Sequence, residues 1–179
     1  MESQLPIEYL TERPTSYLLR GSKLRPNLLE PGHVLTAYPS LFLLEILTVG
    51  KDGLPTIVAA CQLTWQEWFV LLPVIASYPD FCPYNVLHAA FNKACITEEN
   101  IVEAQEILNS ATESKKWDAE VRPLRNVLSR ARLKIQAAFH LDVYSIFETG
   151  YLLHATSAHS SRKEETTPCR ERNVQCVAV

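Results

Sequence analysis

Apolar residues recur every three or four positions over 122–139, which is the period of a helix that buries one face. These apolar positions are Leu124, Val127, Leu128, Ala131, Ile135, Ala138 and Phe139. The opposite face has no acidic residue and carries Arg122, Arg125, Asn126, Ser129, Arg130, Arg132 and Lys134. The pattern predicts an amphipathic helix whose basic face suits an anionic partner, although an ordinary solvated helix with basic residues has the same pattern.

The N-terminal third of the chain has the patterning of strands instead of helices. Short apolar runs occupy 33–38, 41–49 and 56–61, and the last two are separated by Gly-Lys-Asp-Gly at 50–53. Glycine and aspartate tolerate the positive φ of a hairpin turn, so these runs predict a small antiparallel sheet. Residues 1–31 are rich in proline and charge, and we expect an extended arm that adds at most an edge strand.

Three helical patterns lie between the predicted sheet and the basic helix. The first follows Thr64, which forms a capping-box pattern with Glu67, and contains Pro73, which is expected to kink it or start a new turn. A second covers 83–92. The third covers 97–117, where acidic residues outnumber lysines, so it is not expected to face phosphates. Its apolar stripe is expected to be Ile101, Val102, Ala104, Ile107, Leu108 and Ala111.

The C-terminal part of the chain changes pattern twice. Residues 141–153 alternate as a hairpin around Thr149-Gly150, and 155–179 are rich in small polar and charged residues, which predicts a disordered tail. The predicted organisation is an extended arm at 1–31, a folded domain at 32–154 with an inserted helix at about 97–117, and the tail. Strands followed by helices and a closing hairpin define the α+β class.

Composition narrows the classes of protein that fit. The chain has 179 residues, of which 47% are hydrophobic and 21% charged, as in an ordinary globular domain. Its formal net charge of -3 means that nucleic-acid binding has to be argued from a local patch. The 5 cysteines show no C-x-x-C spacing, and residues 1–19 have no long apolar run, so we expect reduced thiols in a cytoplasmic protein without a secretory leader. No apolar run is long enough for membrane insertion.

One combination of residues raises the question of catalysis. Cys82 and Cys95 flank His88, and a cysteine nucleophile needs a neighbouring base. No third residue in the sequence is placed to orient such a pair, and no glycine-rich loop is present to hold a cofactor phosphate. The expectation is therefore a protein that is not an enzyme and binds no cofactor or metal.

Three motifs stand in order along the chain. They read L-T-W-Q-E-W-F-V-L at 63–71, V-L-S-R-A-R-L-K-I at 127–135 and V-Y-S-I-F-E-T-G-Y at 143–151. They resemble the start of the first helix, the recognition helix and the wing of the winged helix-turn-helix effector domain of OmpR/PhoB-type response regulators. The resemblance covers roughly 33–153 and implies an N-terminal antiparallel sheet, three to four helices and a C-terminal β-hairpin, without a receiver domain.

The resemblance implies a DNA-binding transcriptional regulator. Residues 122–139 would enter the major groove, with Arg125, Asn126, Ser129 and Arg130 at base edges and Arg132 and Lys134 at phosphates. The full set expected to contact double-stranded DNA is Arg122, Arg125, Asn126, Ser129, Arg130, Arg132 and Lys134. Leu133 shares this outward face, where it meets a thymine methyl group or covers the N-terminal sheet. RNA polymerase, a sensor protein and a second copy of the chain are further expected partners.

The sequence departs from the family at two places. The wing has Phe147-Glu148 where the family has Arg-Gly, so no minor-groove arginine is implied, and 97–117 lengthens the loop that meets RNA polymerase in the family. An acidic segment, a negative net charge and an apolar wing tip also fit an alternative. In that alternative, the winged helix is a protein–protein interaction module without DNA binding.

Overall fold

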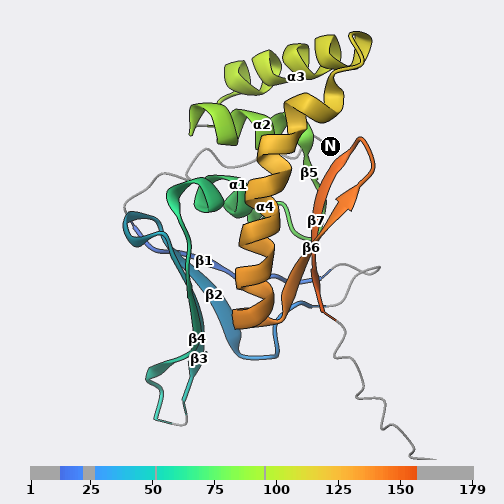
Figure 1. Cartoon of the computed structure of the whole chain (residues 1–179). Helices are drawn as coiled ribbons and strands as arrows, with labels where there is room; N and C mark the ends of the chain where they lie inside the picture. The colour runs from blue at the N-terminus through green and yellow to red at the C-terminus, as the bar shows by residue number, and fades with distance from the viewer. Residues whose placement is uncertain (1–12, 22–26, 51, 95, 157–179) are drawn as a thin grey trace, which may run out of the picture.

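The computed structural model describes residues 13–21, 27–50, 52–94 and 96–156. It shows a mixed α+β fold with two antiparallel sheets and four α-helices, as the sequence pattern predicts. The long helix α4 passes between the N-terminal sheet on one side and the C-terminal hairpin on the other (Figure 1). None of the helices in these ranges has both the length and the apolar content needed to cross a lipid bilayer.

The N-terminal sheet is antiparallel and has four strands in chain order. They are β1 (Thr15–Tyr17), β2 (His33–Tyr38), β3 (Leu43–Val49) and β4 (Pro55–Gln62). The predicted arm thus contributes β1 as an edge strand, while residues 1–12 and 22–26 of that arm lie outside the described residues. The third strand starts two residues later than predicted, because 39–41 form a short 3-10 turn.

The other edge of this sheet contains a bulge. Ile46 and Leu47 of β3 pair with Ala59 and Ile57 of β4, so Val58 is an extra residue on the β4 side. Ile57 and Val58 are both more than half exposed. The alternation of buried and exposed side chains is therefore lost along much of β4.

Helix α1 (Trp65–Ala76) begins with the predicted capping box. The Thr64 amide donates to Glu67 Oε2 at 2.8 Å, and the Glu67 amide donates to Thr64 Oγ1 at 3.4 Å. Pro73 does not end the helix or start a new one, because it lies in the last turn, where only one hydrogen bond is lost. Trp68 and Leu71 fill the core beneath this helix.

The next two helices lie beside each other at one end of the molecule (Figure 1). A two-residue strand, β5 (Cys82–Pro83), leads directly into α2 (Tyr84–Lys93). The next helix, α3 (Glu98–Glu113), is capped by the Thr97 side chain, which accepts a hydrogen bond from the Asn100 amide. The predicted apolar stripe of α3 is wrong at two positions, because Val102 is 58% and Ile107 is 37% exposed. Only its Ala104, Leu108 and Ala111 side is fully buried.

Helix α4 (Trp117–Phe139) is longer than predicted. The third predicted helix was expected to reach 117, but α3 ends at Glu113 and Trp117 is the first residue of α4. The predicted start at Arg122 is therefore five residues too late, and Pro123 lies inside the helix. The buried stripe differs from the prediction at two positions, because Val121 is buried as well and Ala138 is only half-buried. It consists of Val121, Leu124, Val127, Leu128, Ala131, Ile135 and Phe139.

The predicted C-terminal hairpin is present as β6 (Leu141–Ile146) and β7 (Gly150–Ala155). Its second strand also pairs with β5, which gives the strand order β5-β7-β6. A Cβ atom on Gly150 would lie 2.0 Å from the Cys82 carbonyl oxygen, so glycine is required where β7 pairs with β5. The strand extends into the segment predicted as tail, and 157–179 lie outside the described residues.

Candidate functional site

The outward face of α4 is the predicted site, and its residues differ in how accessible they are. Asn126, Ser129 and Arg130 are exposed, as is Arg122, whose side chain is 67% exposed. The three remaining predicted residues, Arg125, Arg132 and Lys134, are only partly exposed. Leu133 is 64% exposed and therefore does not cover the N-terminal sheet. Four of the seven predicted side chains are thus accessible to a partner, and the other three are only partly accessible.

Two arginines near the start of α4 share one carboxylate. Asp118 accepts a hydrogen bond from Arg122 Nη2 at 3.2 Å and another from Arg125 Nη1 at 2.5 Å. These bonds from Arg122 and Arg125 hold the pKa of Asp118 below its usual value. All three side chains are at the surface, where water and salt weaken such pairs, so a stronger anion can displace the carboxylate.

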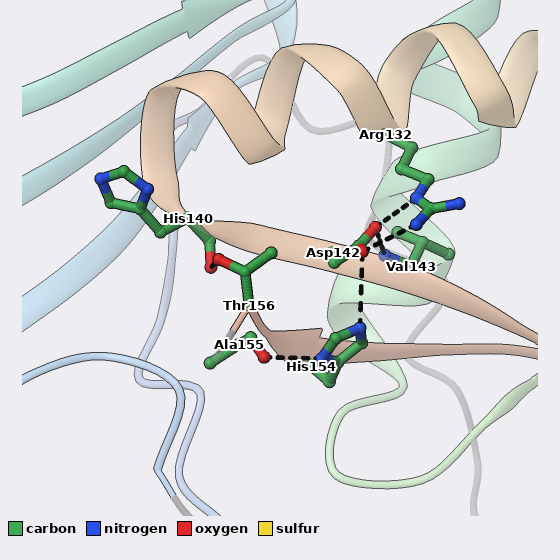
Figure 2. A network of polar contacts seen from close by, with 7 residues as sticks. All are labelled: Arg132, His140, Asp142, Val143, His154, Ala155 and Thr156. Atoms are coloured by element: carbon green, nitrogen blue, oxygen red, sulfur yellow. Dashed lines mark hydrogen bonds and ion pairs between the residues drawn. The ribbon is translucent and has the colours of Figure 1, made fainter. Parts of the chain in front are cut away.

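Arg132 joins α4 to the hairpin through a buried carboxylate. Its Nε and Nη2 both donate to Asp142 of β6, the second at 2.9 Å, and Asp142 also accepts from the Val143 amide at 2.8 Å (Figure 2). Burial alone would raise the pKa of Asp142, but the bonds from Arg132 and Val143 hold it below its usual value. The two-pronged bond fixes the position of the guanidinium and uses its Nε and Nη2 groups, while Nη1 has no bond to Asp142.

His154 of β7 lies next to this pair and was not predicted from the sequence. Its Nε2 is 3.7 Å from Asp142 Oδ2, and its Nδ1 donates to the Ala155 carbonyl oxygen at 2.6 Å (Figure 2). The imidazole also stacks on Tyr144 with a ring separation of 3.8 Å. Asp142 and His154 face each other in the β6–β7 register, so a correct hairpin alignment was the one sequence signal that could have found this pair.

Lys134 neutralises a second buried carboxylate. Its Nζ donates to Glu67 Oε2 of α1 at 2.7 Å and to the Gln62 carbonyl oxygen at 3.4 Å. Glu67 is only 2% exposed, and burial alone would raise its pKa, but bonds from Lys134 and Thr64 hold that pKa below its usual value. Lys134, which was expected to contact a DNA phosphate, thus forms an ion pair within the protein instead.

These pairings leave little free positive charge on the predicted site. Arg130 is the only one of the helix's five basic side chains that forms no ion pair with another residue in the described part of the chain. Its neighbours Asn126 and Ser129 are neutral. The exposed face is therefore a mixed polar surface with one free cation, and it is less basic than the sequence indicated.

The β6–β7 hairpin lies beside the exposed face of α4 and contributes apolar, acidic and hydroxyl side chains. Phe147 at its tip is 82% exposed and is followed by exposed Glu148. Closer to α4, Ser145 and Tyr151 form one wall of a cavity of about 170 Å³, and Arg125, Ser129 and Arg132 form the other. The site thus combines a polar helix face, a small polar cavity and an apolar tip.

The cysteine–histidine pair has unfavourable properties for catalysis. Cys82 is fully buried, and burial raises the pKa of its thiol to about 12, so the reactive thiolate is not formed at neutral pH. His88 is buried as well, with its Nε2 3.0 Å from Glu120 Oε1. Cys95 lies outside the described residues.

Comparison with known proteins identifies no family for this chain. No protein-family model matches the sequence, and no curated protein or solved structure matches the chain.

Proposed function

We propose that the chain is a DNA-binding transcriptional regulator of the winged-helix type, with α4 as the helix that enters the major groove. The observation that carries this proposal is the exposed run Asn126, Ser129 and Arg130 on a helix whose opposite face is firmly packed in the core. Asparagine pairs with adenine N6 and N7, and arginine pairs with guanine O6 and N7. Rigid support of such side chains favours readout of base edges.

The order of elements supports the same proposal. A four-stranded sheet, α1, the short β5, α2, then α4 and the β6–β7 hairpin correspond to the parts of a winged helix, with α3 as an insertion. The sequence resemblance to OmpR/PhoB-type effector domains assigns the recognition helix to the same segment. In that arrangement, the hairpin would lie beside the DNA backbone with Phe147 and Glu148 at its tip.

The charge pairing predicts how such binding would behave. Arg122 and Arg125 can exchange Asp118 for a DNA phosphate because their pairs are at the surface, whereas Arg132 and Lys134 are held by buried carboxylates. We therefore expect Arg122, Arg125 and Arg130 to supply most of the electrostatic contact. Two phosphate contacts, from Arg122 and Arg125, give a slope of log affinity against log salt of about -2, and a phosphate contact from Arg130 as well would bring it to about -3.

Selection of bound duplexes from a random pool tests the proposal. The wild-type chain is expected to enrich one sequence motif. Arg130→Ala should lose preference at one position, whereas Lys93→Ala, which removes a cation on α2, should enrich the wild-type motif. No retention of any duplex at low salt would contradict the proposal.

A second candidate function is protein–protein interaction through the same fold. The observation that favours it is the set of large exposed apolar side chains around α4, which are Trp65 at 51%, Leu133 at 64% and Phe147 at 82% exposure. Exposed aromatic residues are enriched at protein interfaces. RNA polymerase and a sensor protein are the proposed partners of this kind. If Phe147→Ser abolishes partner binding but leaves duplex selection unchanged, the two functions use separate surfaces.

A further inference from the structure

The cavity between α4 and the β6–β7 hairpin has the properties of an anion site. Its polar lining consists of Arg125, Ser129, Arg132, Ser145 and Tyr151. Its apolar floor is formed by Leu128 and Val143, and no carboxylate is among the lining residues. The volume of about 170 Å³ is sufficient for one small oxyanion and some water, but not for a base or a peptide side chain with its backbone.

Two arginines of α4 line the cavity. They are separated by two turns of α4, which is about 10 Å along the helix axis, and Ser129 lies on the same face between them. Arg132 uses Nε and Nη2 for Asp142, so its Nη1 keeps its donors. Arg125 uses Nη1 for Asp118 and also hydrogen-bonds the Tyr84 side chain, which leaves part of its five N–H donors. Both guanidiniums thus have N–H groups that remain available.

The hairpin side adds hydroxyl groups to these cationic donors. Tyr151 is 8% exposed, and burial together with a hydrogen bond to Tyr84 raises its pKa, so its hydroxyl stays protonated. The same hydroxyl is hydrogen-bonded to Ser145, so a bound anion would have to share or replace these contacts. Ser145 Oγ lies 3.4 Å from Tyr84 Oη, next to the same wall. Residues with hydrogen-bonding side chains therefore line the cavity from α4, β6 and β7, which are three separate elements.

We propose that this cavity binds a phosphate group. A phosphate presents several oxygen atoms in a tetrahedral arrangement and suits donors from several directions, whereas a carboxylate presents two oxygens in one plane. The group can belong to a DNA backbone or to a small phosphorylated molecule, and the chemistry of recognition is the same. The inference uses the same face as the proposed DNA binding, but it rests on the cavity alone.

The carboxylates behind the arginines limit the affinity for a single phosphate. Asp118 and Asp142 already offset the charge of Arg125 and Arg132, although neither acid lines the cavity. We therefore expect a dissociation constant on the order of 1 mM for inorganic phosphate. A phosphate attached to a larger ligand would gain from the contacts of that ligand.

Titration of the whole chain with inorganic phosphate at constant ionic strength, followed by amide NMR shifts, tests the proposal. Saturable shifts at Ser129, Ser145 and Tyr151 are expected. Arg125→Gln should weaken binding by about 10-fold, the loss expected for one charge-assisted contact, and Ser145→Asp should abolish it by placing a negative charge at the wall. Lys93→Gln removes the same charge on α2 and should bind phosphate as the wild type does.

Several outcomes would overturn the inference or identify the source of the phosphate. Shifts that do not saturate, or an Arg125→Gln variant that responds like the wild type, would overturn the proposed phosphate site.

A second titration with duplex DNA separates the phosphate site from the proposed DNA binding. Phosphate and glycerol phosphate binding without duplex binding supports the cavity and removes the DNA proposal, whereas duplex binding without a phosphate response removes the cavity site. Phosphate saturation together with duplex-induced shifts at Ser145 and Tyr151 identifies the DNA backbone as the source.

Discussion

Lys134 of α4 places its Nζ 2.7 Å from Oε2 of Glu67, the residue that also completes the capping box of α1. One buried carboxylate thus fixes the start of α1 and holds the central helix against it. Because Glu67 is 2% exposed, its charge depends on Lys134 and Thr64 for compensation.

Lys134→Met should therefore destabilise the chain. Loss of one partner of a fully buried pair costs about 3–5 kcal/mol, but Lys134 is 38% exposed and water reaches the remaining charge, so we expect about 2 kcal/mol. Urea unfolding followed by circular dichroism measures the change. The double variant Lys134→Met, Glu67→Gln should recover at least half of the loss, and a single variant as stable as the wild type would contradict this role.

Stability should also fall in acid for the same reason. The folded-state pKa values of Glu67 and Asp142 are lowered, while the unfolded values are about 4.3 and 3.9. The unfolded chain then binds protons first, so this stabilisation is complete above about pH 5 and is lost as the pH falls through the folded pKa values. Urea midpoints from pH 7 to pH 3 should decline more steeply for the wild type than for Glu67→Gln, and equal slopes would contradict the assignment.

Arg132→Lys should show that the fork to Asp142 depends on geometry and not only on charge. Lysine keeps the positive charge but cannot form both hydrogen bonds at once. We expect a loss of about 1 kcal/mol, because the arginine side chain is 44% exposed and solvent screens the pair. Thermal unfolding measures this loss, with Arg130→Lys as the matched control that should have no effect.

Gly150→Ala tests the close approach of β7 to its neighbouring strand β5. The added Cβ would lie 2.0 Å from the Cys82 carbonyl oxygen, so the strands must separate, and a loss of about 3 kcal/mol or more is expected. Gly53→Ala is the control, because nothing lies within 4 Å of its Cβ and only the strain of φ +79 remains, about 1 kcal/mol. Equal losses of stability in the two variants would show that the β5–β7 pairing tolerates a methyl group at position 150.

Most helices and strands could be predicted from local sequence patterns, and the errors in that prediction also have local causes. The periods of β2, α1 and α4 identified these elements, and the Thr64–Glu67 spacing located the start of α1. The first five residues of α4 were missed, and Pro123, a residue normally unfavourable inside a helix, lies within it. The two-residue β5 is too short to have a pattern of its own.

The candidate site was less predictable because its electrostatics depend on tertiary contacts. The pairing of Arg122 with Asp118 has the i,i+4 spacing of helix ion pairs and could have been found. Lys134 and Glu67 are 67 residues apart, and Arg132 pairs with Asp142 only through the packing of α4 on β6. The number of basic residues in α4 therefore overstated how much unpaired positive charge its surface carries.

The bulge in β4 has a consequence for how the chain behaves at high concentration. Residues 54–62 contain no charged side chain, and Ile57 and Val58 are exposed on the free edge of the sheet. An edge strand of this composition is a template for sheet growth between molecules. The extra residue at Val58 breaks the even spacing of amide and carbonyl groups, so the strand of a neighbouring molecule cannot pair along its full length. Solubility at this edge thus depends on backbone geometry, because no charged side chain is present there to provide it.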